Sequence, residues 1–218
     1  MSKENKSTVE IYEKIAHLYL ATSKEHDRLY PTDAAKKEER LKKLIKESFS
    51  TLKKGSKILE IGSGSGDNAK FIKNLGFEVT ASDTAKSFIE ATKQQGLNTI
   101  KFNVIEDNFP EKYSGVFCWR VFVHFTKEDA LKTIKKIYNN LENGGVFIFN
   151  AINREIKEID SEWVDFDSEY HLGEERYYNY FRKEELDNII RQTEFKVLDF
   201  HLEGGKDNKK WLVYVLKK

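Results

Sequence analysis

The sequence predicts an α/β fold: a doubly wound, mostly parallel sheet of seven strands, with an N-terminal helical cap and a C-terminal antiparallel hairpin. First, 218 residues with 39% hydrophobic content suffice for one globular core, or a core with a small cap. Second, from Lys57 onward short apolar runs alternate with segments of helical periodicity, which is typical of parallel sheets covered by helices. Third, the last two apolar runs have a glycine-containing polar turn and no helix between them, as in a hairpin at a sheet edge.

The N-terminal quarter predicts two helices, because its apolar residues recur at helical spacing. Ile11, Ile15 and Tyr19 mark the first helix, and a series from Leu41 to Leu52 marks the second, with Pro31 between them. We expect residues 1–54 to form the cap and residues 55–218 to form one compact unit.

Five parallel strands and two hairpin strands account for the predicted sheet. The expected strands are 57–61, 77–81, 99–102, 115–119, 146–150, 195–202 and 211–216. The clearest helix lies between the fourth and fifth strands. Thr126 and Asp129 resemble a helix cap at its start, and Gly144-Gly145 would end it.

The composition limits the kinds of molecule that this protein is expected to bind. Lys plus Arg number 37 and Asp plus Glu number 36, so the net charge of +1 gives no electrostatic footprint for nucleic acid. No apolar stretch is long enough to predict a membrane span, and the five histidines form no compact ligand set for a metal. The single cysteine, Cys118, cannot form an internal disulfide, and the polar N-terminus has no signal core; both favour a cytoplasmic protein. The oligomeric state stays open.

A glycine-rich turn follows the first strand, where the sequence runs Glu-Ile-Gly-Ser-Gly-Ser-Gly from Glu60 to Gly66. Glycines let the backbone turn sharply and approach a ligand, and the helix that follows offers free N–H groups to an anion. A purely structural turn is the alternative.

Two more polar residues follow the next two strands. Asp83 lies about 20 residues beyond the glycines, where an acid can accept both hydroxyls of a ribose, or can cap the next helix. Asn103, followed by the apolar Val104, could bind an adenine amino group, or could simply end its strand. Ligands of such sheets bind at the carboxyl ends of the strands, so the three features together favour an adenosine-type ligand.

At this point the chain resembles the class I (Rossmann-like) S-adenosylmethionine-dependent methyltransferases of small-molecule type. The resemblance covers residues 57–218 in order, from the glycine turn through the segments 113–118, 121–125, 141–145 and 180–186. It implies S-adenosylmethionine as the cofactor and implies roles for the strand-end residues. The resemblance assigns the methionine end of the cofactor to Gly62, Ser63, Gly64 and Cys118. It assigns the ribose to Asp83 and Thr84, and the adenine to Asn103 and Val104. The family usually has an acid where this chain has Asn103.

The implied function is transfer of a methyl group to an oxygen or nitrogen of a small-molecule metabolite by in-line displacement. His124 is a candidate general base, although a residue there can instead fix the loop before the next helix. Arg120 could bind an anionic acceptor, and Tyr12 and Tyr19 share a helix face that could close over the site. An aromatic-rich insert could also line an acceptor pocket or pack on the sheet; its residues are Trp163, Phe166, Tyr170, Tyr177, Tyr178 and Tyr180.

Two alternatives of other classes remain. A nicotinamide-dependent oxidoreductase would also have a glycine turn and an acid about 20 residues on. However, its fingerprint needs Gly or Ala where this chain has Asp67. A non-catalytic protein that binds an adenosine ligand is the other alternative, and turnover of the donor distinguishes it from an enzyme.

Overall fold

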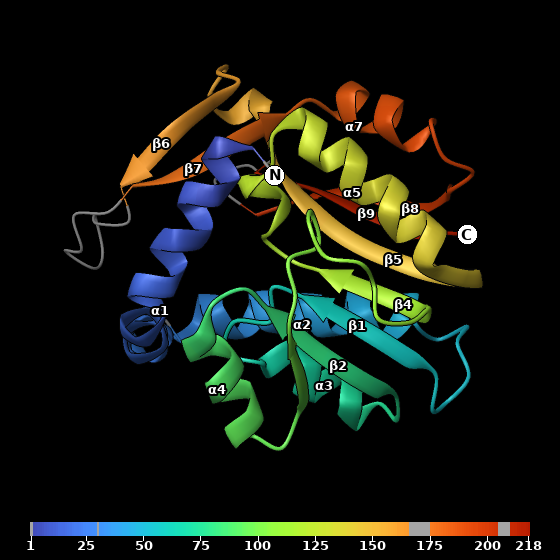
Figure 1. Cartoon of the computed structure of the whole chain (residues 1–218), viewed down its shortest axis with the longest axis horizontal. Coiled ribbons are helices and arrows are strands. Elements are labelled where there is room, and N and C mark those ends of the chain that lie inside the picture. The colour runs from blue at the N-terminus through green and yellow to red at the C-terminus, as the bar shows by residue number, and fades with distance from the viewer. Residues whose placement is uncertain (1, 30, 166–174, 205–209) are drawn as a thin grey trace.

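A single mixed sheet covered by helices forms the centre of the molecule (Figure 1). The computed structural model describes residues 2–29, 31–165, 175–204 and 210–218, without the side chains of residues 22–34 and 165. Five parallel strands occur in the spatial order β3 (Asn98–Lys101), β2 (Glu78–Asp83), β1 (Lys57–Ile61), β4 (Tyr113–Cys118) and β5 (Leu141–Asn153).

The predicted C-terminal hairpin is confirmed. Its strands are β8 (Lys196–Glu203) and β9 (Trp211–Lys217), and β9 lies antiparallel between β5 and β8. The turn predicted at Asp207 and Asn208 lies outside the described residues. With the hairpin included, the sheet contains the seven predicted strands, and the parallel ones end at one common edge.

Two further strands were not expected from the sequence. β6 (Ser161–Asp165) and β7 (Glu175–Phe181) pair antiparallel to form an arm, so the sheet has nine strands in the described part of the chain. β7 joins the sheet through the end of β5, where Ile152 lies opposite Tyr180. The arm therefore extends the sheet beyond the carboxyl end of β5, on the edge where a ligand is expected.

Helices cover both faces of the sheet. α5 (Lys127–Asn140) and α7 (Lys183–Ile190) lie side by side on one face (Figure 1), and α3 (Asp67–Asn74) packs on the other. α4 (Lys86–Gln94) packs against β2 and β3. Two short 3₁₀ helices, η1 (Phe122–His124) and η2 (Arg154–Ile156), follow β4 and β5.

The boundaries of α5 were predicted correctly at one end only. Thr126 caps the helix as expected, because its hydroxyl accepts a hydrogen bond from the Asp129 N–H at 3.1 Å. The prediction that Gly144-Gly145 ends the helix is wrong: α5 ends at Asn140, and β5 begins at the next residue. Gly144 instead lies within β5 with φ +78°, and this left-handed residue accompanies a register irregularity against β4.

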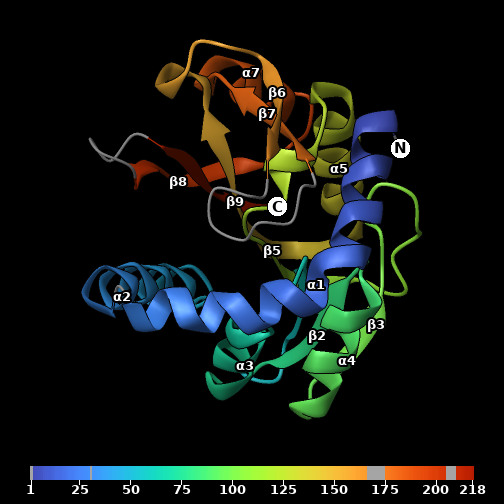
Figure 2. The same ribbon diagram turned by 90° about the vertical axis from the view of Figure 1, so that its left-hand side faces the viewer.

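The N-terminal segment forms two helices that divide at Pro31, as predicted. α1 (Lys3–Leu29) crosses the carboxyl edge of the sheet beside α4 and β7, whereas α2 (Pro31–Ser48) packs with α3 on one face (Figure 2). Ile45 of α2 is fully buried there. No helix in the described part of the chain combines the length and the hydropathy needed to cross a bilayer.

Candidate functional site

The glycine-rich turn after β1 is tied to β2 by its own serine. Ser63 donates its N–H to the Ser82 carbonyl at 2.8 Å, and its hydroxyl accepts the Ser82 N–H at 2.9 Å. The Ser63 side chain is therefore engaged within the protein, and these bonds hold the turn in one conformation.

The glycines of the turn have different local surroundings. Gly62 has φ +71°, and a Cβ there would lie 2.4 Å from Cγ2 of Val121, so this glycine is needed for close packing of the loop after β4. Gly64 also has a left-handed φ, +51°, yet a Cβ there would meet no atom within 4 Å. The space beside Gly64 is open, as a ligand that approaches the backbone requires.

Asp83 connects the end of β2 to this turn. Its Oδ2 accepts the Gly64 N–H at 3.0 Å, and its Oδ1 accepts the N–H groups of Thr84 at 2.8 Å and Ala85 at 3.0 Å. Burial raises the pKa of Asp83, whereas these three bonds oppose that rise. An ionised carboxylate has about four acceptor positions, so Asp83 retains capacity for one further donor such as a ribose hydroxyl.

Glu60 is a functional candidate that the sequence analysis did not single out. It lies on β1 just before the turn and is 1% exposed, and its Oε2 has no hydrogen-bond partner among the described residues. Burial raises its pKa to about 8, against hydrogen bonds from Ser63, Asn68 and the Ala69 backbone. An unpartnered, buried carboxylate oxygen is costly on its own, and a cationic group of a ligand would satisfy it.

A cleft of about 290 Å³ lies where α1 faces the ends of β2 and β3. It brings together two residues predicted for the donor, Thr84 and Asn103, and is completed by Lys6, Val9, Glu10, Lys101, Glu106 and Asp107. The Oδ1 of Asn103 already accepts the Ile105 N–H at 3.0 Å, and Val104 is 3% exposed. The cleft is therefore lined by polar groups on both sides, with Val104 packed into the core next to it.

The end of β4 lies next to the glycine turn, since Cys118 pairs with Ile61 of β1. Burial raises the pKa of the Cys118 thiol, so this cysteine is a neutral, space-filling side chain. Two residues later, Arg120 adopts φ +59°, and its N–H donates to Oδ1 of Asn150 at 2.6 Å. A non-glycine residue in this region of φ is strained, and such strain is concentrated at functional sites.

Tyr12 and Tyr19 lie on one face of α1, as their spacing predicts. Both rings contact Phe88 of α4, at centroid distances of 6.4 Å and 5.7 Å. Nearby, the α1 residue Glu13 accepts the N–H of Lys86 at 2.8 Å. These contacts hold α1 across the first turn of α4, directly beside Asp83.

His124 is 7% exposed, and both of its ring nitrogens are engaged. Nδ1 lies 2.9 Å from the Tyr177 carbonyl, and Nε2 lies 3.1 Å from the Tyr12 hydroxyl. Burial, helped by the charge of Arg176, lowers the pKa of His124 to about 3. His124 therefore links α1, through Tyr12, to β7, through Tyr177.

Arg176 on β7 is a second residue that the sequence analysis missed. Its Nη1 donates to the Tyr12 hydroxyl at 3.1 Å, and its guanidinium lies 4.9 Å from the centre of the Tyr178 ring. Of the aromatic insert, Tyr177, Tyr178 and Tyr180 belong to β7, whereas Phe166 and Tyr170 lie outside the described residues.

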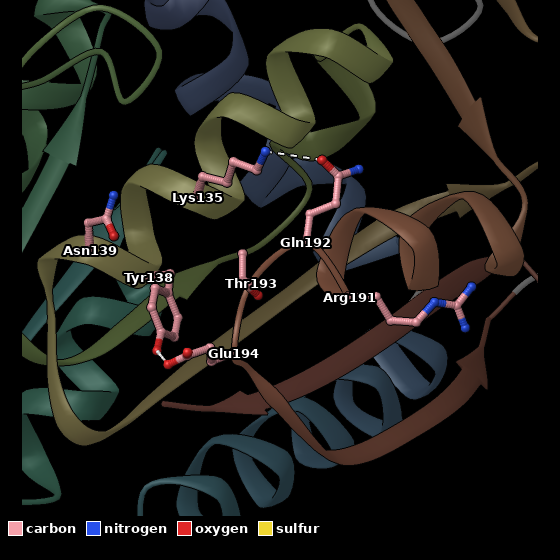
Figure 3. Close-up of a pocket in the computed structure, with 7 residues that line it drawn as sticks. All are labelled: Lys135, Tyr138, Asn139, Arg191, Gln192, Thr193 and Glu194. Atoms are coloured by element: carbon pink, nitrogen blue, oxygen red, sulfur yellow. Dashed lines mark hydrogen bonds between the residues drawn. The ribbon is translucent and has the colours of Figure 1, made fainter.

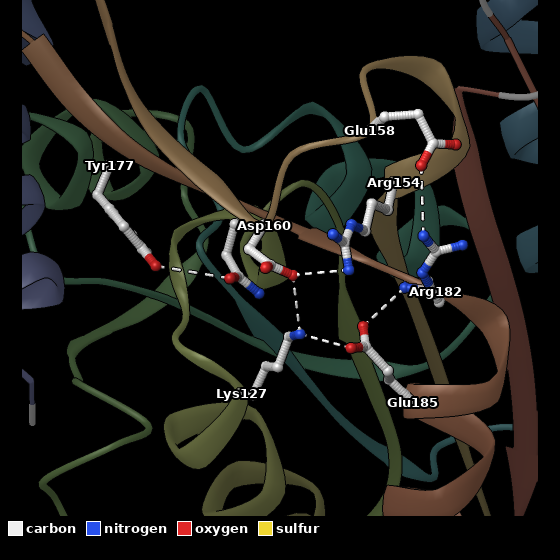
Figure 4. A network of polar contacts seen from close by, with 8 residues as sticks. Lys127, Arg154, Glu158, Asp160, Tyr177, Arg182 and Glu185 are labelled. Carbon is white, nitrogen blue, oxygen red and sulfur yellow. Dashed lines mark hydrogen bonds and ion pairs between the residues drawn. The ribbon is translucent and has the colours of Figure 1, made fainter.

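A network of ion pairs fixes the base of the β6–β7 arm (Figure 4). Asp160, just before β6, pairs with Lys127 of α5 at 3.2 Å and with Arg154 at 2.9 Å. Lys127 also pairs with Glu185 of α7, whose carboxylate accepts the Arg182 N–H at 2.9 Å. The network anchors β7, so the side chains that β7 presents to α1 have a firm support.

A wider depression of about 550 Å³ lies elsewhere, between α5 and the end of α7 (Figure 3). Its polar side chains pair with one another: Tyr138 donates to Glu194 at 2.8 Å and Lys135 donates to Gln192 at 3.0 Å. None of the predicted site residues lines it, so it is a surface depression separate from the strand-end site.

Comparison with known proteins decides the family, because residues 34–199 match the methyltransferase domain family. The chain belongs to the class I S-adenosylmethionine-dependent methyltransferase family. A ubiquinone biosynthesis O-methyltransferase from Rickettsia typhi is 31% identical over 160 residues, which are 71% of this chain and 63% of that protein. A probable S-adenosyl-L-methionine-dependent methyltransferase, TehB, from Haemophilus influenzae is 23% identical over 54% of this chain and 49% of its own length. The chain thus spans less than two thirds of these relatives.

Solved structures agree with this methyltransferase fold. An S-adenosylmethionine-dependent methyltransferase from Clostridium acetobutylicum has a TM-score of 0.69 at 17% identity, covering 95% of this chain and 98% of its own. Magnesium protoporphyrin IX methyltransferase from Synechocystis, solved with bound S-adenosylmethionine, has a TM-score of 0.72 at 10% identity, covering 100% and 98%. At these identities the likeness concerns the fold.

The residues of this methyltransferase fit the family's cofactor. S-adenosylmethionine has an ammonium group, a carboxylate, a ribose diol and an adenine. The unpartnered Oε2 of Glu60 suits the ammonium group, the open backbone at Gly64 suits close approach of the methionine part, and the spare acceptor position of Asp83 suits the diol. The cleft lined by Asn103 and by Thr84, the residue after Asp83, suits the adenine.

Proposed function

We propose that this methyltransferase transfers a methyl group from S-adenosylmethionine to an oxygen or nitrogen of a small-molecule acceptor, by in-line displacement. The observation that carries the proposal is the convergence at one edge of the sheet of the unpartnered Oε2 of Glu60, the open space beside Gly64 and the remaining acceptor position of Asp83. The bound cofactor supplies a methyl group on a positively charged sulfur, which needs positioning and exclusion of water rather than activation.

The chain's own residues supply that positioning. Glu60, Ser63, Gly62 and Gly64 would hold the methionine part beside Cys118. Thr84 and Asp83 would hold the ribose, while Asn103 and Val104 would frame the adenine.

The acceptor side is formed, in this proposal, by the cap of residues 1–54 and by the β6–β7 arm. Tyr12, Tyr19 and Arg120 would contact the acceptor, and His124 would act either as a general base or as the residue that positions Tyr12. The contacts of α1 with α4 and with β7 support the proposal that the cap covers the donor site and the acceptor site.

Small-molecule acceptors are favoured because the Rickettsia relative is named for ubiquinone biosynthesis. The lone cysteine, Cys118, also suits a cytoplasmic enzyme. The methyltransferase family assignment gives no support to a nicotinamide-dependent oxidoreductase or a non-catalytic adenosine-binding protein.

Methyl transfer is tested by incubating the protein with methyl-labelled S-adenosylmethionine and a panel of small phenols, carboxylic acids and amines. We expect S-adenosylhomocysteine and a labelled acceptor to form in equal amounts. The Asp83→Ala variant should remain folded and should lose most of the methyl transfer activity. Tight binding of S-adenosylhomocysteine with no labelled product from any member would favour a binding protein instead.

A further inference from the structure

Two arginines from different elements lie beside one aromatic cluster at the proposed acceptor side of the site. The Arg176 guanidinium on β7 lies 4.9 Å from the centre of the Tyr178 ring. Arg120, two residues after β4, lies 5.8 Å from the centre of the Trp211 ring, and Trp211 and Tyr178 pack against the same buried cluster of Val123, Ile152 and Tyr180. The strained backbone of Arg120 is fixed by Asn150, so this arginine is held in place at the carboxyl edge of the sheet.

The hydrogen bonds beside these arginines have only one possible direction. The Tyr177 carbonyl is an acceptor only, so Nδ1 of His124 carries the proton of the neutral ring, and Nε2 accepts. Tyr12 therefore donates its hydroxyl proton to Nε2, and its oxygen accepts from Arg176. His124 would therefore have to release the Tyr12 hydroxyl before its Nε2 could remove a proton from an acceptor.

Two positively charged side chains lie beside this cluster. Arg176 donates a hydrogen bond to the Tyr12 hydroxyl and lies over the Tyr178 ring, and Arg120 lies over the neighbouring Trp211 ring. Positive surroundings favour a bound anion and disfavour an ammonium group. Guanidinium groups also match the geometry of oxygen anions.

We propose that the acceptor is bound as an oxygen anion, a carboxylate or a phenolate, by Arg120 and Arg176, and is methylated at oxygen. The inference rests on the proposed function and names its substrate class. A lone pair of the oxygen forms the new O–CH₃ bond, and the C–S bond breaks with its electron pair left on sulfur. The negative charge of the acceptor and the positive charge of the sulfonium cancel, so the step transfers no proton. An anionic acceptor thus needs no general base, in agreement with the engaged nitrogens of His124.

The wild-type protein, saturated with S-adenosylhomocysteine, provides the first test. The carboxylate probes are benzoate, benzamide and benzylamine, which have similar size and differ in charge. The phenolate probes are 4-nitrophenolate and the neutral 4-methylphenol. Binding is measured by ligand-observed NMR titration. If the acceptor is a carboxylate, we expect benzoate to bind at least about tenfold more tightly than benzamide. If the acceptor is a phenolate, we expect 4-nitrophenolate to have the same advantage over 4-methylphenol. Benzylamine should bind most weakly in both cases. Equal or tighter binding of benzamide and benzylamine, together with no preference for 4-nitrophenolate, overturns the proposal.

Arginine variants provide the second test. Arg120→Gln and Arg176→Gln should each reduce the preference for the anion by about tenfold or more, because each removes a charged hydrogen-bond donor. Arg191→Gln, which removes an exposed arginine next to α7, is the matched control and should leave the preference unchanged. Arg120 is exposed, so its variant should fold even if Arg176→Gln does not.

Melting temperature and affinity for S-adenosylhomocysteine are recorded for every variant. If folded Arg120→Gln and Arg176→Gln keep the preference for anions, these arginines do not bind the acceptor. An equal loss of the preference in Arg191→Gln also contradicts their proposed role. If wild-type protein fails to bind S-adenosylhomocysteine, the proposed function fails. If it binds S-adenosylhomocysteine but shows no preference for anions, only the present inference fails.

Discussion

The Asp83 carboxylate accepts a hydrogen bond from the backbone N–H of Gly64 at 3.0 Å, which joins the end of β2 to the turn after β1. Two features that are 19 residues apart in the sequence therefore form one structural unit. The same carboxylate also holds the first residues before α4 through Thr84 and Ala85. Asp83 thus organises the loop before α4, and its remaining acceptor position is available for the ribose hydroxyl that we propose it binds.

Gly64→Ala should separate backbone strain from loss of ligand space. An alanine with left-handed φ costs roughly 1–2 kcal/mol, and denaturant unfolding should show that loss. Gly55→Ala is the matched control, because Gly55 also has a positive φ, +79°, and open space around it, but lies away from the site. Only Gly64→Ala should also lower the affinity for S-adenosylhomocysteine, by tenfold or more in calorimetry. Equal affinity in the two variants would remove Gly64 from the donor site.

Glu60 should make the stability of the free protein fall as pH rises. Its folded pKa is about 8, above the ordinary value of 4.5, so between these values the folded state holds a proton that the unfolded chain releases. The loss from this group is at most about 1.4 kcal/mol per pH unit from pH 5 to 8. Unfolding of Glu60→Gln measured across this range should lack that slope, whereas Glu47→Gln, at an exposed position, should keep it. An unchanged slope in Glu60→Gln would show that Glu60 is ionised throughout.

His124→Asn and His124→Ala distinguish the two roles of His124. If His124 positions Tyr12, the asparagine amide can still donate to the Tyr177 carbonyl, so Asn should retain turnover within about tenfold and exceed Ala. A general base contributes roughly 10²–10⁴-fold, and its loss would affect both variants alike. The pH profile of kcat/KM should also lack a histidine ionisation near neutrality, because burial lowers the pKa of His124 to about 3.

The α1 contacts predict closure over the bound donor. Hydrogen exchange of residues 9–28 should slow when S-adenosylhomocysteine binds, because α1 lines the cleft beside Thr84 and Asn103. Helix α7, none of whose residues lines the cleft, serves as the internal control and should exchange at the same rate in both states. Identical exchange of residues 9–28 with and without ligand would make α1 an ordinary packing element.

The sequence predicted the seven main strands and the strand-end residues because these depend on local patterns of apolar residues and glycine. It missed the β6–β7 arm, because residues 161–165 and 175–181 mix charged, polar and aromatic residues and show no clear alternation of apolar and polar positions. Glu60 was missed because its burial is decided by what covers the sheet. The partners of His124 are 53 and 112 residues distant, so no local pattern shows that both nitrogens are engaged.

Donor binding is tested most directly by isothermal titration calorimetry of S-adenosylhomocysteine and, separately, NADH into wild-type protein and Asp83→Ala. We predict one site for S-adenosylhomocysteine, no heat of binding for NADH, and an affinity lower by roughly 1–3 kcal/mol in folded Asp83→Ala, the cost of lost charged hydrogen bonds. Binding of NADH in preference to S-adenosylhomocysteine, or an unchanged affinity in Asp83→Ala, would contradict the account.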